Sequence, residues 1–231
     1  TQVNFNASYG WKKVSKLVKT MSPYDYAYYQ YELGSTDYGN YNDLDIWKSI
    51  EGRDYQDEVF GRTGTQAIYN ANVSGGSKDF KYNVSYAHNQ ENSIMEKSGY
   101  NKDNIGAKLQ AKLNKWLTFD FNARMAYQKI KGLSGGADTN DSNAANSTVA
   151  QTITFAPIQE LVSADEDEEN SSSSRRSPME RLDGTYKLQT RFQQNYNAAL
   201  TWKPFKHWTA KTEFGYGWKY YDTDQAWTAL A

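Results

Sequence analysis

Apolar and polar residues alternate along most of this chain, and the alternation is clearest between residues 66 and 127. From residue 105 the odd positions are apolar and the even positions mainly polar, and the pattern resumes after a turn at 114–116. A period of two is typical of a β-strand, because successive side chains point to opposite faces of a sheet. The apolar positions of these two predicted strands are Ile105, Ala107, Leu109, Ala111, Leu113, Leu117, Phe119, Phe121, Ala123, Met125 and Tyr127.

Each of these strands carries about ten or more residues of unbroken alternation, whereas strands of globular proteins average about five or six. A strand that spans a membrane needs about nine to eleven residues. An apolar row opposite a row of Lys, Gln, Asn, Asp and Arg is typical of a barrel wall with lipid outside and water inside. A large soluble sandwich or curved sheet also alternates, so these two strands alone leave both folds open.

Similar alternation predicts further strands at 3–11, 66–74, 80–89, 186–202 and 208–220, which gives about seven in all. No clear period is present at 35–65, and a second short helix is expected near 146–155.

A first short helix is predicted at 24–33. Ser22 can cap it, Pro23 suits the first helical position, and Gly34 can end it. Three tyrosines, Tyr24, Tyr28 and Tyr31, would share one face of this helix. We favour the interpretation that this face packs against a neighbouring element, and a platform for a ligand is the alternative.

The connections between the strands are of two kinds. Those at 75–79, 114–116 and 203–207 are tight, while those at roughly 13–65, 89–102 and 129–184 are long. Three tryptophans, Trp116, Trp202 and Trp208, stand beside the tight turns. Short turns at one end, long loops at the other and a ring of Trp at an interface are typical of outer-membrane barrels.

We therefore expect an all-β fold, an antiparallel transmembrane β-barrel segment with long external loops and a short helix. The smallest single-chain barrels have about eight strands, and hydrocarbon does not tolerate open sheet edges, so about seven strands predict part of a larger barrel. The sequence starts at Thr1 without an initiating Met or an apolar signal segment, so we expect a processed product or an internal piece.

Composition narrows the classes of protein further. The net charge is -1 and no basic patch stands out, so a nucleic-acid partner is not expected. Aromatic residues make up 15% of the chain while the mean hydropathy is -0.88, which excludes a helical membrane protein and suits a barrel. The absence of cysteine removes disulfides, thiolate metal sites and cysteine nucleophiles.

Two motifs stand out in the first half of the chain: residues 54–60 read Asp-Tyr-Gln-Asp-Glu-Val-Phe, and Val-Ser-Gly-Gly-Ser at 73–77 precedes a Tyr-containing return strand. They resemble the SusC/RagA family of TonB-dependent outer-membrane transporters, in which the first motif usually reads Asp-Trp-Gln-Asp-Glu-Ile-Phe. A Trp-Leu pair at 116–117, Ser-Pro-Tyr-Asp-Tyr at 22–26 and Pro157 also follow the order of the family. The resemblance covers most of the chain.

The resemblance implies that residues 1–231 are a partial TonB-dependent receptor β-barrel domain, the early part of a barrel of about 22 strands. The plug, the TonB-contacting segment and the closing strands would be absent from it. The family imports oligosaccharides or peptides with a SusD-like lipoprotein, driven by the TonB complex, which would act through the missing N-terminal part. The implied location is the outer membrane of a Gram-negative bacterium. The other partners would be outer-membrane lipid and a glycan or peptide substrate, which these residues do not distinguish.

Few residues suggest ligand or metal chemistry. Trp47 and Tyr55 are candidates for stacking on a sugar face, although packing is the favoured interpretation for both. The acidic run at 165–169 offers three candidate calcium ligands, Asp165, Asp167 and Glu169. The run lacks the glycine and the spacing of a calcium loop, so a solvated external loop is favoured.

Catalysis is not expected from this sequence. His88 and His207 are far apart and neither pairs with a serine motif, so we predict no enzyme, no catalytic residue and no cofactor. The polar row of the strands would instead line a wet interior and contact a plug; it comprises Lys108, Gln110, Lys112, Asp120, Asn122, Arg124, Gln189, Arg191, Gln193 and Asn195.

Two functions follow from these features. The first is a part of an outer-membrane importer, in which the apolar rows face lipid. The second is a soluble or cell-surface β-rich protein that binds carbohydrate or mediates adhesion, in which the same rows form a dry core.

Overall fold

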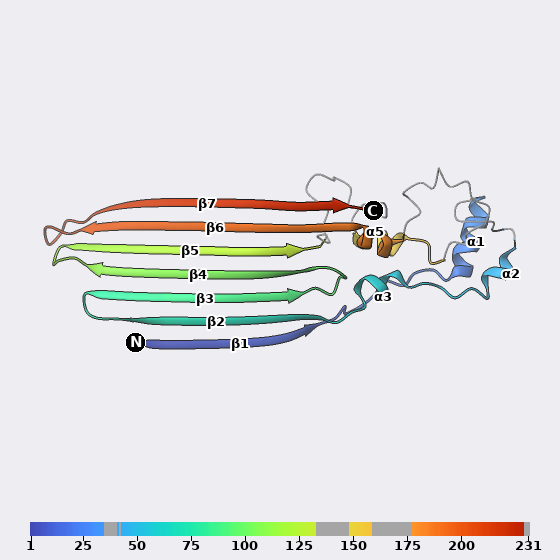
Figure 1. Ribbon diagram of the computed structural model, residues 1–231, viewed down its shortest axis with the longest axis horizontal. Helices are drawn as coiled ribbons and strands as arrows, with labels where there is room; N and C mark the ends of the chain where they lie inside the picture. Colours follow the sequence, from blue (N-terminus) through green and yellow to red (C-terminus); the bar gives the residue numbers. More distant parts are fainter. Residues whose placement is uncertain (35–40, 42, 133–147, 159–176, 229–231) are drawn as a thin grey trace.

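The computed structural model describes residues 1–34, 41, 43–132, 148–158 and 177–228, and they form one antiparallel sheet with short helices beyond one end (Figure 1). Seven strands lie side by side in chain order from β1 to β7. They are β1 (Gln2–Lys12), β2 (Gly64–Gly76), β3 (Phe80–Asn92), β4 (Gly99–Lys112), β5 (Leu117–Lys131), β6 (Thr185–Trp202) and β7 (Ala210–Trp227). The helices are α1 (Pro23–Leu33), α2 (Leu44–Trp47), α3 (Tyr55–Phe60), α4 (Thr148–Thr154) and α5 (Pro178–Gly184).

The register of the sheet brings like positions of neighbouring strands together. Phe121 of β5 lies opposite Leu109 of β4 and Ala198 of β6. Its neighbour Asn122 lies opposite Lys108 and Asn197. Because side chains alternate between the two faces of a strand, every predicted apolar row falls on one face and every polar row on the other. The predicted all-β antiparallel fold is therefore confirmed, as a sheet that is not closed.

Both outer edges of the sheet lack a further strand among the described residues. β1 pairs only with β2, and β7 pairs only with β6. An edge strand presents a row of unpaired N–H and C=O groups, which favours addition of another strand. The sheet is thus compatible with a segment of a larger barrel.

Turns at one end of the sheet are short, as predicted. In the β2–β3 turn the amide of Ser77 donates to the carbonyl of Phe80 at 2.6 Å, and Gly76 has a φ of 152°, which residues with a side chain rarely adopt. In the β4–β5 turn the amide of Trp116 donates to Oδ1 of Asn114 at 2.9 Å. All helices lie beyond the opposite end, where the long connections are (Figure 1).

Helix α1 begins and ends where the sequence predicts. The side chain of Ser22 accepts a hydrogen bond from the amide of Asp25, and Gly34 ends the helix in the left-handed region. The predicted packing of its tyrosines holds for Tyr24, which is half-buried with Lys48 over its ring, and is wrong for Tyr28 and Tyr31, which are 45% and 50% exposed. The helix instead buries Pro23 and Ala27, since a small residue allows closer packing against the neighbouring segments.

Other boundaries also differ from the sequence predictions. The loop expected at 89–102 is shorter, because β3 continues to Asn92 and β4 begins at Gly99. The region without a clear period contains α2 and α3, and β7 begins at Ala210 rather than at residue 208. Helix α5 was missed although Ser177 and Glu180 form a capping box at its start. The helix expected near 146–155 is present as α4.

The helices pack into two small hydrophobic clusters rather than onto a face of the sheet. One cluster contains Ala27, Tyr41, Trp47, Ala156 and Ile158, so it joins α1 and α2 to the segment after α4. The other joins α3 to α5 and to the β3–β4 loop through Val59, Met95 and Leu182. These two clusters, which we call the helical layer, therefore hold together connections that are far apart in sequence.

Candidate functional site

The polar face of the sheet is the part of the molecule with the most ligand-binding chemistry. Its rows run across all seven strands, because the positions of this face lie opposite one another and most of them are polar. One row contains Asn83, Lys108, Asn122 and Asn197, and the next contains Ser85, Gly106, Arg124 and Asn195. Amide side chains both donate and accept hydrogen bonds, so this face can bind polar ligands of either character.

Hydrogen bonds between side chains connect neighbouring strands on this face. Asn72 and Asn83 exchange two hydrogen bonds of 3.1 and 3.2 Å. The side chain of Gln110 donates to Asp120 at 2.8 Å. The buried Oδ1 of Asn122 accepts none from the described residues, and an unpaired buried polar atom costs about 1–3 kcal/mol. Hydrogen bonds therefore hold several polar side chains of this face in place, while Oδ1 of Asn122 has no donor among the described residues.

Two adjoining hollows lie on this face, and they share Asn83, Lys108 and Asn122. The first has a volume of about 540 Å³ and is lined among others by Lys102, Asn104, Arg124, Gln193 and Asn195. The second, of about 500 Å³, lies nearer the short turns and includes Lys81, Asp120, Lys211 and Glu213. Both hollows are open and most of their lining residues are polar, so they suit a hydrated ligand or a second protein surface better than a small apolar molecule.

The opposite face is apolar and carries stacked aromatic rings. Phe121 stacks with Tyr196, and Tyr196 stacks with Tyr216, with ring centroids 6.5 and 6.4 Å apart. Beside them Phe192 meets Tyr127 and Trp218 edge to face. The large side chains of this face are exposed on the edge strands and exposed or half-buried between their neighbours on the central ones, and no described element packs over the face.

The apolar part of this face is bounded at both ends of the strands, by tryptophans at one end and by charged residues at the other. Near the short turns, Trp116, Trp202 and Trp208 are all exposed, as an aromatic girdle requires. Toward the helices the apolar row of β5 ends at Tyr127 and is followed by Lys129, while β7 reaches Asp222. On β5 the apolar stretch 117–127 matches the length of about nine to eleven residues that a membrane-spanning strand needs.

His88 and Asp103 lie opposite each other on the apolar face, toward the end of the sheet that carries the helices. Nδ1 of His88 and Oδ1 of Asp103 are 2.7 Å apart, and the hydroxyl of Tyr86 donates to the same oxygen. Tyr69 stacks on the imidazole ring. The other histidine, His207, lies in the β6–β7 turn, so the structure does not bring the two histidines together.

The segment 54–60, on which the family resemblance partly rests, has a structural role. Asp54 caps α3 by accepting from the amides of Gln56 and Asp57. The buried side chain of Gln56 forms two hydrogen bonds with the backbone of Val18, at 2.8 and 3.0 Å. Val59 is fully buried in the second cluster. The motif therefore anchors the long β1–β2 connection to the helical layer.

The two aromatic candidates for sugar stacking are both buried. Trp47 is 2% exposed and contacts Tyr41, with ring centroids 5.4 Å apart. Tyr55 is 5% exposed and packs edge to face on Phe155. Burial raises the pKa of the Tyr55 phenol, an effect that nearby Arg53 opposes. Both rings serve packing in this conformation, and contact with a ligand stays a prediction.

The candidate calcium ligands Asp165, Asp167 and Glu169 lie outside the described residues. Within the described ranges, no group of His, Asp and Glu side chains is arranged to hold a metal ion. No helix in the same part of the chain is long and apolar enough to cross a membrane.

The fold of the chain is similar to one part of each of three solved structures. Three solved structures, of the RagAB peptide transporter and of the RagAB peptide importer in its open-open and closed-closed states, match 96% of this chain. The TM-scores are 0.70 to 0.72 and the sequence identities 14% to 15%, a likeness that establishes the fold. The chain spans 28% of the length of these neighbours. No family model matches the sequence, and no curated protein matches it.

Proposed function

We propose that this chain is a wall segment of an outer-membrane, TonB-dependent importer of peptides or oligosaccharides. The observation that carries the proposal is the two-faced open sheet. It is aromatic and apolar on one side and polar and hollowed on the other, and neither edge has a further strand among the described residues. Further strands would complete a barrel, placing the aromatic face in lipid and the polar face in the lumen. The fold shared with the RagAB peptide importer supports this assignment.

The proposal includes the partners that the sequence resemblance implies. A SusD-like lipoprotein would cover the end of the barrel that carries the helices, and the TonB complex would act through a plug outside residues 1–231. The lumen residues would contact that plug by hydrogen bonds. Import, rather than catalysis, is the activity that this arrangement serves.

The test is the size, location and activity of the native protein. An antibody against this chain should detect, in outer-membrane fractions, a protein several times heavier than 26.4 kDa. Deleting the gene should abolish uptake of a peptide or an oligosaccharide that the parent strain imports, and disrupting TonB should have the same effect. A soluble native product of 26.4 kDa would instead support the carbohydrate-binding or adhesion protein.

A further inference from the structure

The cationic residues of the sheet gather on its polar face. That face carries ten Lys and Arg side chains and three carboxylates, whereas the apolar face carries two Lys and three Asp. The ten are Lys12, Lys81, Lys102, Lys108, Lys112, Arg124, Lys187, Arg191, Lys211 and Lys219, and the three carboxylates are Glu91, Asp120 and Glu213. The whole chain has a net charge of -1, so folding concentrates positive charge on one surface.

The middle of this face is more basic than its margins. Four consecutive rows, which we call the central band, run from the row of Lys108 to the row of Arg191 and contain five cations and no carboxylate. The five are Lys102, Lys108, Arg124, Arg191 and Lys219. The carboxylates lie in rows outside the band, and each already has a partner: Glu91 pairs with Lys12, Glu213 with Lys211, and Asp120 with Gln110.

The cations of the central band have no acidic partner in the described parts of the chain. Lys108, Arg124, Arg191 and Lys219 are exposed, and Lys102 is half-buried. Arg191 donates to Gln189 and lies over the ring of Tyr221, both uncharged. Lys102, Lys108 and Arg124 line the same hollow of about 540 Å³. A cleft lined by one sign of charge attracts and concentrates ligands of the opposite sign.

Amide groups rather than aromatic rings surround these cations. Asn104, Asn122, Gln193 and Asn195 line the hollow, and they match the N–H and C=O groups of a peptide backbone. Sugar rings usually pack on aromatic faces, and the only ring of the central band is that of Tyr221, under Arg191. The chemistry therefore favours a peptide over an acidic sugar chain.

We propose that the central band selects acidic peptides, whose carboxylates pair with Lys102, Lys108 and Arg124 during passage along the polar face. The proposal rests on the proposed import function, and it names the charge and class of the substrate. The guanidinium of Arg124 can hold a carboxylate with two parallel hydrogen bonds, while the two lysines act as point charges.

The experiment uses the full-length protein, purified in detergent with the subunits that accompany it. Binding is measured for a short Glu-rich peptide, for the same peptide with every Glu replaced by Gln, and for an oligogalacturonate. Each is measured at low and at high ionic strength, because salt screens exposed charges. The variants are Lys102→Gln, Lys108→Gln and Arg124→Gln, singly and combined. The matched control is Lys129→Gln, which removes an exposed cation from the opposite face of β5.

We expect the Glu-rich peptide to bind more tightly than its Gln counterpart at low salt. The triple variant should weaken binding of the Glu-rich peptide about tenfold or more, as the sum of three exposed ion pairs. Binding of the Gln peptide and the effect of Lys129→Gln should stay within experimental error. Unchanged binding of the Gln peptide also shows that the triple variant is folded.

Three results would overturn the proposal. Equal affinity for the two peptides, or an unchanged affinity in the triple variant, would show that the band does not select charge. A clear preference for oligogalacturonate would assign the cations to an acidic glycan. None of these results bears on the import role, which fails on a different one: uptake that is unchanged when the gene is deleted or TonB is disrupted.

Discussion

Adjacent residues of one strand can meet opposite environments in this protein. Phe121 lies in the stacked aromatic row, while Asn122 lines both hollows of the polar face. Because the two residues are neighbours in β5 and lie on opposite faces, the same substitution at each position tests the orientation of the wall.

Phe121→Arg should destabilise the full-length protein in lipid vesicles by roughly 2–4 kcal/mol, because it places a charge near the bilayer midplane. Asn122→Arg should cost much less, since its guanidinium would enter the wet polar face. Urea unfolding in vesicles measures both free energies. Equal costs for the two substitutions would contradict a lipid-facing Phe121.

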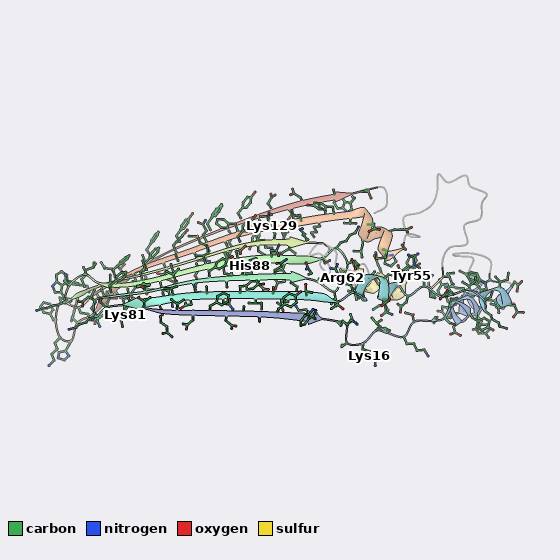
Figure 2. All side chains as sticks on the ribbon, turned by 60° about the horizontal axis from the view of Figure 1, so that its bottom comes forward. Lys16, Tyr55, Arg62, Lys81, His88 and Lys129 are labelled. Carbon is green, nitrogen blue, oxygen red and sulfur yellow. The ribbon has the colours of Figure 1, made fainter. Side chains whose placement is uncertain are left out.

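Gln56 holds a long connection through a single buried side chain. Gln56→Ala should leave the N–H and C=O of Val18 without their partner and cost about 1–3 kcal/mol. Trypsin should then cut faster at Lys16, which lies in the extended segment after β1 (Figure 2). Gln225→Ala, at an exposed position of β7, is the control. Unchanged cleavage at Lys16 would show that Gln56 does not secure this segment.

At the scale of elements, Arg62 fixes the loop between β3 and β4. Arg62 lies at the end of the sheet that carries the helices (Figure 2). Its guanidinium donates to the carbonyls of Ser93, Met95 and Ser98 and pairs with Glu96. The planar fork of arginine makes several such bonds at once, which lysine cannot reproduce. One side chain therefore closes this loop against the start of β2.

Arg62→Ala should raise the rate of amide hydrogen exchange at 93–98, because four carbonyl and carboxylate partners lose their donor. Arg62→Lys should restore only the ion pair with Glu96 and protect the loop partly. Full protection in the lysine variant would mean that charge, rather than the fork, holds the loop.

Helices and strands differed in how well the sequence predicted them. The strands were predicted because alternation over many residues is a strong signal, and α1 because Ser22, Pro23 and Gly34 mark its ends. Helices α2 and α3 were missed, since four and six residues are too few to show a helical period. The ends of β3 and β4 were read as loop because residues such as Gln90 and Asn101 are polar on the otherwise apolar face.

At the scale of the whole molecule, the open edges and the uncovered apolar face both favour aggregation in water. Val3, Phe5 and Phe214 are among many large apolar side chains that are exposed on the sheet. A long flat edge beside exposed apolar surface favours aggregation in water. In the proposed barrel, further strands would pair with both edges and lipid would cover the apolar face.

Residues 1–231 alone, refolded in detergent-free buffer, should aggregate rather than form a cooperatively folding monomer. Analytical ultracentrifugation and urea titration monitored by circular dichroism measure this. A soluble, monomeric and cooperatively folded chain would contradict the barrel-wall assignment and favour the β-rich binding protein.

The sequence by itself determined which residues share a face of each strand, because the period of two is a local property of the backbone. It also determined the ends of α1, through local capping groups. Only the tertiary structure decided which strand positions lie opposite one another, since register depends on pairing between segments far apart in the chain. That pairing gathers Lys102, Lys108 and Arg124 around one hollow and buries Trp47 and Tyr55 in the helical layer.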